Sequence, residues 1–297
     1  MQNIENLSAI IYSGQYEDGT IASTFTVEEG VEEIAENAFR DFLSLEKLIL
    51  PSSLRRISAA AFSGCRNLQE IVFAPGLSEL GDEAFSGCSS LLGVRLPDTV
   101  VHIGEGCFEG CASLSSLKLS EGLLSIGAGA FSFCFNLHTV TLPDACESIE
   151  FNAFCGCFSL TSVKLPARLS LIEESLFEGC RSLASVDLPA GLRRIGRRAF
   201  RGCSALRSLI LPVGLLEIGL DAFADCKGLY RLAIPKGVRE LEDAEVFGGC
   251  DSLREISFGG SAEQWELLLG GKTLTVPTSA GALLTPKIYF LDVKDEI

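Results

Sequence analysis

The residues best suited to chemistry in this chain are its twelve cysteines and two histidines. A zinc site needs three or four Cys or His ligands that converge on one point. The nearest approach to such a set is Cys155 and Cys157, separated by one glycine, together with Cys134 and Cys146. Most of the cysteines, however, recur at a fixed interval among apolar neighbours, which favours packing in a core. We therefore expect buried free thiols, no metal site and a reducing compartment.

The histidines and carboxylates form no recognisable catalytic set. His102 and His138 occupy different positions of the repeat described below, so they should face different surfaces. The sequence has no phosphate-binding loop, dinucleotide fingerprint, nucleophile elbow or zinc-protease motif. No pair of carboxylates is placed in the apolar columns, and exposed Asp and Glu are mostly solvated. We therefore expect no catalytic residue, no cofactor and no enzymatic activity.

A unit of 23 residues repeats along most of the chain. Its phenylalanine recurs ten times, with every step 23 residues except the last, which is 24, at Phe39, Phe62, Phe85, Phe108, Phe131, Phe154, Phe177, Phe200, Phe223 and Phe247. Three residues after the Phe stands a Cys in nine copies, and six residues after it stands a Leu in all ten. Apolar residues at the ninth and eleventh positions after the Phe alternate with a variable residue, which is typical of a short strand. Such a fixed period predicts a solenoid.

The repeat resembles that of a known family. Residues 199–219, AFRGCSALRSLILPVGLLEIG, carry the full pattern and resemble the BspA-type leucine-rich repeat, with the similarity extending over about residues 25–260. The resemblance implies a leucine-rich-repeat solenoid, often found on surface proteins of host-associated bacteria, where several members act as adhesins. The family has no shared catalytic residues, so the resemblance implies protein binding only as a class.

We expect a β-rich solenoid with short parallel strands on its concave face, helical or 3₁₀ turns on its convex side, and a cap at each end. One copy cannot fold alone, because ordering a residue costs about 1–2 kcal/mol and a buried side chain contributes only roughly 1.5–3 kcal/mol. The expected organisation is one continuous domain. It comprises a hairpin cap with a degenerate repeat over 1–38, ten repeats over 39–258, and a cap of helix plus strand over 259–297.

Both caps have local sequence signals. Leu7–Tyr12 and Ile21–Val27 flank a turn-rich segment and predict a hairpin. Ser261 and Gln264 have the spacing of a capping box at the start of a helix, in which Trp265 would close the core. The other predicted elements are a surface loop, Lys272–Thr285, and a final strand, Lys287–Val293.

The charge balance limits the class of partner. The chain has 24 Lys and Arg against 39 Asp and Glu, a net charge of −15, which disfavours nucleic acid and anionic membranes. No run of apolar residues is long enough to insert in a membrane. The beginning of the sequence lacks the basic and apolar regions of a signal peptide. We therefore expect a cytoplasmic monomer, with the cell surface or secretion as the alternative that the family resemblance implies.

The candidate binding site lies on the predicted concave face, at the eighth and tenth positions after each Phe. Its residues are Arg95, Lys118, Thr139, Thr141, Ser162 and Lys164. The cations would bind carboxylates of a protein partner, and the small hydroxylic residues would leave room for its backbone. We expect a non-enzymatic scaffold for protein–protein interaction, of an adhesin-like kind. The alternative is a structural or accessory repeat module with no ligand on this face.

A second basic cluster falls mostly at turn positions of the repeat. Its members are Arg193, Arg194, Arg197, Arg198, Arg201 and Arg207. We expect these side chains to form ion pairs with neighbouring acidic turns.

Overall fold

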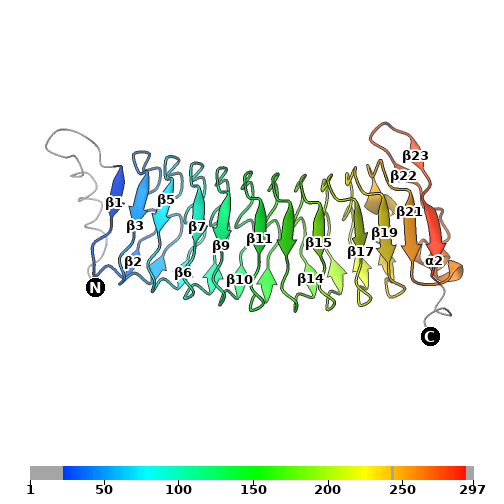
Figure 1. Cartoon of the computed structure of the whole chain (residues 1–297), viewed down its shortest axis with the longest axis horizontal. Helices are drawn as coiled ribbons and strands as arrows, with labels where there is room; N and C mark the ends of the chain where they lie inside the picture. Colours follow the sequence, from blue (N-terminus) through cyan, green and yellow to red (C-terminus); the bar gives the residue numbers. More distant parts are fainter. Residues whose placement is uncertain (1–22, 242–243, 292–297) are drawn as a thin grey trace. The chain divides into compact units, whose positions relative to one another are not determined.

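The computed structural model describes residues 23–241 and 244–291, and its contacts divide the chain into two compact units. Unit 1 is Met1–Ile149 and unit 2 is Glu150–Ile297. Each unit is a parallel β-solenoid of stacked coils (Figure 1). The predicted strand Leu7–Tyr12 lies outside the described residues, and one continuous domain stays a prediction.

In unit 1 each coil supplies a longer and a shorter strand, and these form two separate rows (Figure 1). The longer strands are β1 (Thr24–Thr26), β3 (Lys47–Ile49), β5 (Glu70–Val72), β7 (Gly93–Arg95), β9 (Ser116–Lys118) and β11 (Thr139–Thr141). The shorter strands, which form one six-stranded sheet, are β2 (Glu33–Ile34), β4 (Arg56–Ile57), β6 (Glu79–Leu80), β8 (His102–Ile103), β10 (Ser125–Ile126) and β12 (Ser148–Ile149). Strands of successive coils pair in parallel, with residues 23 apart in the sequence opposite each other.

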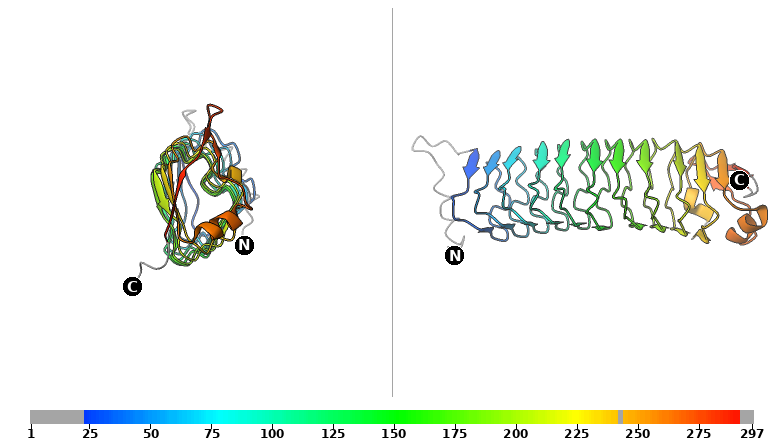
Figure 2. Two further views of the ribbon diagram at one scale, coloured as in Figure 1. Left: turned by 90° about the vertical axis from the view of Figure 1, so that its right-hand side faces the viewer. Right: turned by 60° about the horizontal axis from the view of Figure 1, so that its bottom comes forward.

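Unit 2 repeats this arrangement, and the views of Figure 2 show its coils lying one behind another. Its longer strands are β13 (Ser162–Lys164), β15 (Ser185–Asp187), β17 (Ser208–Ile210), β19 (Arg231–Ile234) and β21 (Glu255–Phe258). Its shorter strands are β14 (Leu171–Ile172), β16 (Arg194–Ile195), β18 (Glu217–Ile218) and β20 (Glu240–Leu241). The predicted final strand is confirmed as β24 (Lys287–Phe290), which pairs in parallel with β21.

The phenylalanines form a stacked column inside each unit, as the period predicts. In unit 1 neighbouring rings of the column stack with centroids 4.9 to 5.4 Å apart. In unit 2 the corresponding separations are 5.6 to 6.0 Å. Cys and Leu columns lie beside these rings and are also fully buried. The inward columns therefore supply the core of both units, and each coil depends on its neighbours for burial.

The Ala-Phe turn of each coil is held by two kinds of backbone hydrogen bond. Within the coil, the Cys65 amide donates to the Phe62 carbonyl at 3.2 Å, a bond of the 3₁₀ type. Alternate amides instead donate to the next coil, as Phe62 does to Ala84 at 2.8 Å and Gly64 to Ser86 at 2.7 Å. Among the described residues only η2 (Ala244–Phe247), where the repeat is one residue longer, is a 3₁₀ helix.

The hydrogen bonds from one Ala-Phe turn to the next form a second backbone ladder. This ladder requires a left-handed backbone conformation two residues before and two residues after the Phe. Around Phe85 these positions are Glu83, with φ of 54°, and Gly87, with φ of 72°. Around Phe200 they are Arg198, with φ of 55°, and Gly202, with φ of 75°. Glycine adopts this conformation without steric cost. The left-handed positions and the hydrogen bonds between coils are thus regular features of the predicted turns that the sequence pattern did not reveal.

The C-terminal cap begins with the predicted helix, α2 (Ala262–Leu268). The Ser261 hydroxyl accepts from the Gln264 amide at 3.4 Å, and the Gln264 side chain accepts from the Ser261 amide at 3.0 Å, so the capping box is confirmed. Trp265 is buried with its ring centroid 5.1 Å from that of Phe258 in β21. The single tryptophan therefore covers apolar side chains of the last coil.

The surface-loop prediction for Lys272–Thr285 is wrong in part. This segment contains an antiparallel pair, β22 (Val276–Pro277) and β23 (Leu283–Leu284). Val276 is fully buried, and the Pro277 carbonyl accepts from the Gly249 amide at 2.6 Å. The segment is ordered because it anchors an apolar side chain and completes the backbone hydrogen bonding of the last repeat.

Candidate functional site

The predicted binding residues of unit 1 lie on its longer strands, with their side chains exposed. Arg95 on β7 is directly opposite Lys118 on β9. Thr139 and Thr141 are the exposed ends of β11, on either side of the buried Val140. Because alternate residues of a strand point to opposite faces, these side chains share the outer face of their strands, which we call the strand face.

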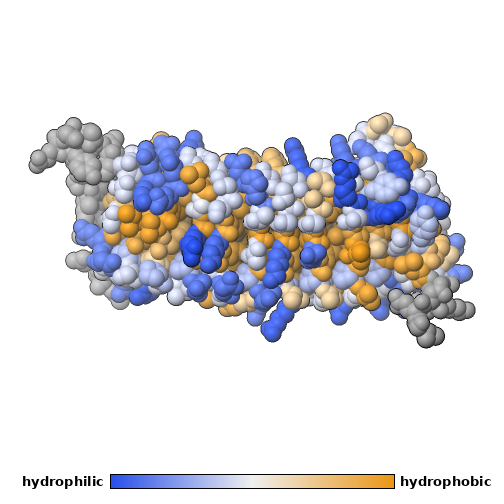
Figure 3. Space-filling model, viewed as in Figure 1, coloured by the Kyte–Doolittle hydropathy of each residue, from blue (hydrophilic) through white to orange (hydrophobic). Residues whose placement is uncertain are grey.

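Ser162 and Lys164, the candidates of unit 2, are the exposed ends of β13. Ser162 is opposite Ser185, and Lys164 is opposite Asp187, both on β15. In the space-filling view, polar side chains cover the longer strands and apolar side chains lie next to them (Figure 3). The structure thus places all six predicted residues on strand faces, and their role in binding stays a prediction.

The cations of the strand face fall into two groups. Lys47 binds Glu70 at 2.8 Å, and Arg231 binds Glu255. Arg95, Lys118 and Lys164 form no ion pair or hydrogen bond through their side chains within the described ranges. Three exposed cations therefore remain open to carboxylates from outside the chain.

The cysteine column is buried, as predicted, but its role is more specific than apolar packing. Eight of its thiols donate to the carbonyl of the Phe in the preceding coil. Cys88 bonds to Phe62 at 3.3 Å, and Cys203 bonds to Phe177 at 3.3 Å. The column therefore satisfies a row of buried carbonyls, which would be costly to leave unpaired.

Burial controls the ionisation of these thiols. It raises the pKa of Cys111 in unit 1 and Cys203 in unit 2 well above the usual range for a thiol. It also raises the pKa of Cys146 to about 11. All twelve cysteines are free, and only Cys155 is partly exposed. A thiol held protonated in this way is a poor nucleophile and a poor metal ligand.

No candidate metal or catalytic centre emerges from the described residues. None of their His, Cys, Asp and Glu side chains gather in a group of three or more that could hold a metal ion. His102 lies exposed on β8, with Nδ1 2.7 Å from the Ser125 hydroxyl. No helix within 23–241 and 244–291 has the length and apolar character needed to cross a membrane.

The second basic cluster forms the predicted ion pairs only in part, since Arg197 and Arg207 form none within the described residues. Arg194 lies 3.3 Å from Glu217, and Arg198 lies 3.6 Å from Asp221. Arg201 lies 3.4 Å from Asp225. Arg193 instead donates to the Gly214 carbonyl at 2.8 Å.

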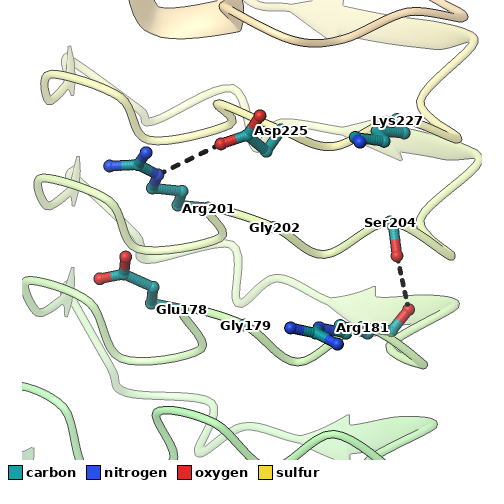
Figure 4. A pocket seen from close by; sticks show the side chains of 8 residues that line it. All are labelled: Glu178, Gly179, Arg181, Arg201, Gly202, Ser204, Asp225 and Lys227. Carbon is teal, nitrogen blue, oxygen red and sulfur yellow. Dashed lines mark hydrogen bonds and ion pairs between the residues drawn. The ribbon is translucent and has the colours of Figure 1, made fainter. Parts of the chain in front are cut away.

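Sequence reasoning missed a groove on the turn side of unit 2, with a volume of about 430 Å³. It is lined by Glu178, Gly179, Arg181, Arg201, Gly202, Ser204, Asp225 and Lys227 (Figure 4). Glu178 and Arg201, one position after the Phe, form one wall, and the residues four positions after it form the other. Between the walls lie Gly179, Gly202 and Asp225, two positions after the Phe. Reading the fourth position along the repeat would have revealed the row Arg181, Ser204 and Lys227.

Comparison with solved structures agrees with this fold. A leucine-rich repeat protein from Bacteroides ovatus is 24% identical with a TM-score of 0.52, over 90% of this chain and 83% of that one. The pneumococcal vaccine antigen PcpA is 22% identical with a TM-score of 0.50, over 93% and 85% of the two chains. A leucine rich cell surface protein from Faecalibacterium prausnitzii is 26% identical with a TM-score of 0.46, over 84% and 82%.

Sequence comparison identifies the family. No curated protein matches the chain in sequence. The family model of the BspA type leucine rich repeat region, of six copies, matches residues 32–158 and again residues 147–266. These matches cover the stacked coils of both units. The chain therefore belongs to the BspA-type leucine-rich repeat family.

Proposed function

We propose that this protein is a non-enzymatic scaffold that binds other proteins through its strand faces. The observation that carries the proposal is the adjacent pair Arg95 and Lys118, exposed and without a carboxylate partner in the described part of the chain. In the same row of unit 1, the exposed cation Lys47 is already paired with Glu70. Two like charges on adjacent strands repel each other. An acidic group on a partner would relieve that repulsion.

The residues around the pair suit a flat partner surface. Gly93, which is half-buried, and Ser116, which is exposed, lie at the other end of β7 and β9, where they add little bulk. Lys164, with Ser162 on the same strand, gives unit 2 a smaller version of this surface. Such a surface provides specificity through charge and hydrogen bonds, and faster association through electrostatic attraction.

Charge reversal tests the proposal. The double variant Arg95→Glu/Lys118→Glu, immobilised next to the unchanged protein, should lose bound proteins that the unchanged protein retains from a lysate. Arg66→Glu, an exposed cation on the turn side of unit 1, is the control and should retain them. Circular dichroism should show that all three proteins are folded. Equal capture by the double variant would reject this surface and favour the structural module without a ligand.

The cellular location stays a prediction with two outcomes. Twelve free thiols suit a reducing cytoplasm. The Faecalibacterium relative is described as a cell surface protein. Protein binding through the strand face is compatible with either location.

A further inference from the structure

The groove of unit 2 places two cations on either side of a short side chain. Arg181, Ser204 and Lys227 occupy the same position in three successive coils. Coils stack about 4.8 Å apart, so the backbones of the two cations are about 10 Å apart. The Ser204 hydroxyl turns away from the space between them, because it donates to the Arg181 carbonyl at 3.2 Å. The Ser204 side chain therefore leaves the space between the two cations open.

These two cations are the unpaired positive charges of the groove. The Arg181 guanidinium lies 4.5 Å from the centre of the Phe158 ring, which orients it. Neither Arg181 nor Lys227 forms an ion pair with a carboxylate in the described residues. Figure 4 shows both side chains leaving the same wall in the same direction.

The acidic residues of the groove are already occupied. Asp225 accepts from Nε of Arg201, in the preceding coil, at 3.4 Å. Glu178 accepts from the Ser175 hydroxyl at 2.7 Å. Asp251, which follows Lys227 in the row, accepts from the amide and hydroxyl of Ser279 at 2.8 and 2.9 Å. Hydrogen bonds from neutral groups leave Glu178 and Asp251 charged, so the balance is set by the lining as a whole. Arg181, Arg201 and Lys227 against Glu178 and Asp225 give the lining of the groove one net positive charge.

We propose that this groove binds a phosphomonoester group. At neutral pH such a group carries a charge of about −1.5 to −2, which matches Arg181 and Lys227 together, whereas a carboxylate carries only one negative charge. The Arg181 guanidinium can bind two phosphate oxygens with parallel hydrogen bonds, and Lys227 supplies a point charge. The groove is open, so the remainder of a phosphorylated peptide or a sugar phosphate fits outside it. This site is separate from the strand face, so the two proposals stand or fall independently.

Calorimetric titration at low ionic strength tests the site. A phosphoserine peptide and ribose 5-phosphate are the two probes, and the unphosphorylated peptide is the control ligand. Arg181→Gln and Lys227→Gln should each weaken binding of the phosphorylated probes by about tenfold, because each removes a charge-assisted contact. Arg66→Gln, at the same repeat position in unit 1, should leave binding unchanged. Stronger binding of one probe supports the site and identifies the source of the phosphate.

A further variant separates binding from folding. Glu178→Gln retains an acceptor for the Ser175 hydroxyl but removes a negative charge, so it should strengthen phosphate binding by about two- to threefold at low salt. A purely structural role of the groove predicts no such gain. The proposal is overturned if both peptides bind equally, if neither phosphorylated probe binds at millimolar concentration, or if Arg66→Gln weakens binding as much as Arg181→Gln does.

Discussion

Units 1 and 2 share one coil design but differ in charge. Residues 1–149 have 20 Asp and Glu against 7 Lys and Arg, a net charge of −13. Residues 150–297 have 19 against 17, a net charge of −2. Both units nevertheless contain the same stacked Phe column and the same buried Cys and Leu columns. The inward positions therefore specify the coil, and the outward positions vary without changing it.

The two units also differ in where their exposed cations lie. The groove row of unit 2 contains Arg181 and Lys227 on either side of a serine. The same positions of unit 1 include Arg66 followed by Ser89 and then Ala112, so the second cation is absent. Unit 1 instead has two adjacent cations without an ion pair on its strand face, Arg95 and Lys118. The same coil design thus carries a pair of cations on the strand face in unit 1 and in the groove in unit 2.

Alkaline pH should produce the largest effect, and it should affect both units. Burial raises the pKa of Cys107 and Cys111 in unit 1 and of Cys180 and Cys203 in unit 2. Above the ordinary thiol pKa of about 8.5, unfolding releases these protons, so stability present below that pH is lost as the pH rises. The expected slope is about 1.4 kcal/mol per pH unit for each thiol. Hydrogen exchange at pH 8, 9 and 10, resolved by peptide, measures it in each unit.

The matched variant for this prediction is Cys107→Ala/Cys111→Ala. It should reduce the pH dependence in peptides of unit 1 and leave that of unit 2 unchanged. An undiminished slope in unit 1 would show that other groups cause the alkaline loss.

Removing a core ring should cost each unit a similar amount. Phe85→Ala and Phe200→Ala each delete a fully buried ring of the stacked column. The expected loss is about 3–5 kcal/mol of unfolding free energy in both cases, from lost burial and the cavity left behind. Urea unfolding measures both, and Phe133→Ala, which truncates an exposed ring, should cost under about 1 kcal/mol. A large difference between the two buried positions would contradict the common design.

The smallest predicted effect is a difference between the units in the stability lost when an exposed ion pair is removed. Arg56 lies between Glu33 and Glu79 on adjacent short strands, whereas Arg194 lies between Leu171 and Glu217. Both ion pairs are exposed, so Arg56→Ala and Arg194→Ala should each cost under about 1 kcal/mol. At low salt Arg56→Ala should cost more, because it leaves two glutamates facing the gap. The difference should disappear in 1 M NaCl, where the screening length is about 3 Å. A larger low-salt cost for Arg194→Ala would contradict this explanation.

The sequence predicts the interior better than the exterior. The period of Phe, Cys and Leu determines the columns, and Ser261 with Gln264 determines the start of α2. The short strands, such as β8, escape prediction because two residues contain no alternation. The left-handed turn positions escape it because residues such as Glu83 take the place of glycine there.

The groove of unit 2 illustrates why a site is harder to predict than a fold. Its cations come from coils 46 residues apart in the sequence, Arg181 and Lys227, and become neighbours only through stacking. Whether these cations can bind an external anion depends on the bonds that nearby acidic residues such as Asp225 and Glu178 already form. Composition and spacing alone do not contain that information.

The second backbone ladder gives each unit a polarity. Its amides point toward the following coil and its carbonyls toward the preceding one, as from Phe62 to Ala84 in unit 1 and from Phe177 to Ala199 in unit 2. Parallel peptide dipoles add along their common direction. A solenoid of this kind therefore has unlike ends, one presenting acceptors and the other presenting donors, and two copies of the same end cannot bond to each other through this ladder. Whole coils can be inserted or deleted between the ends without disturbing either termination.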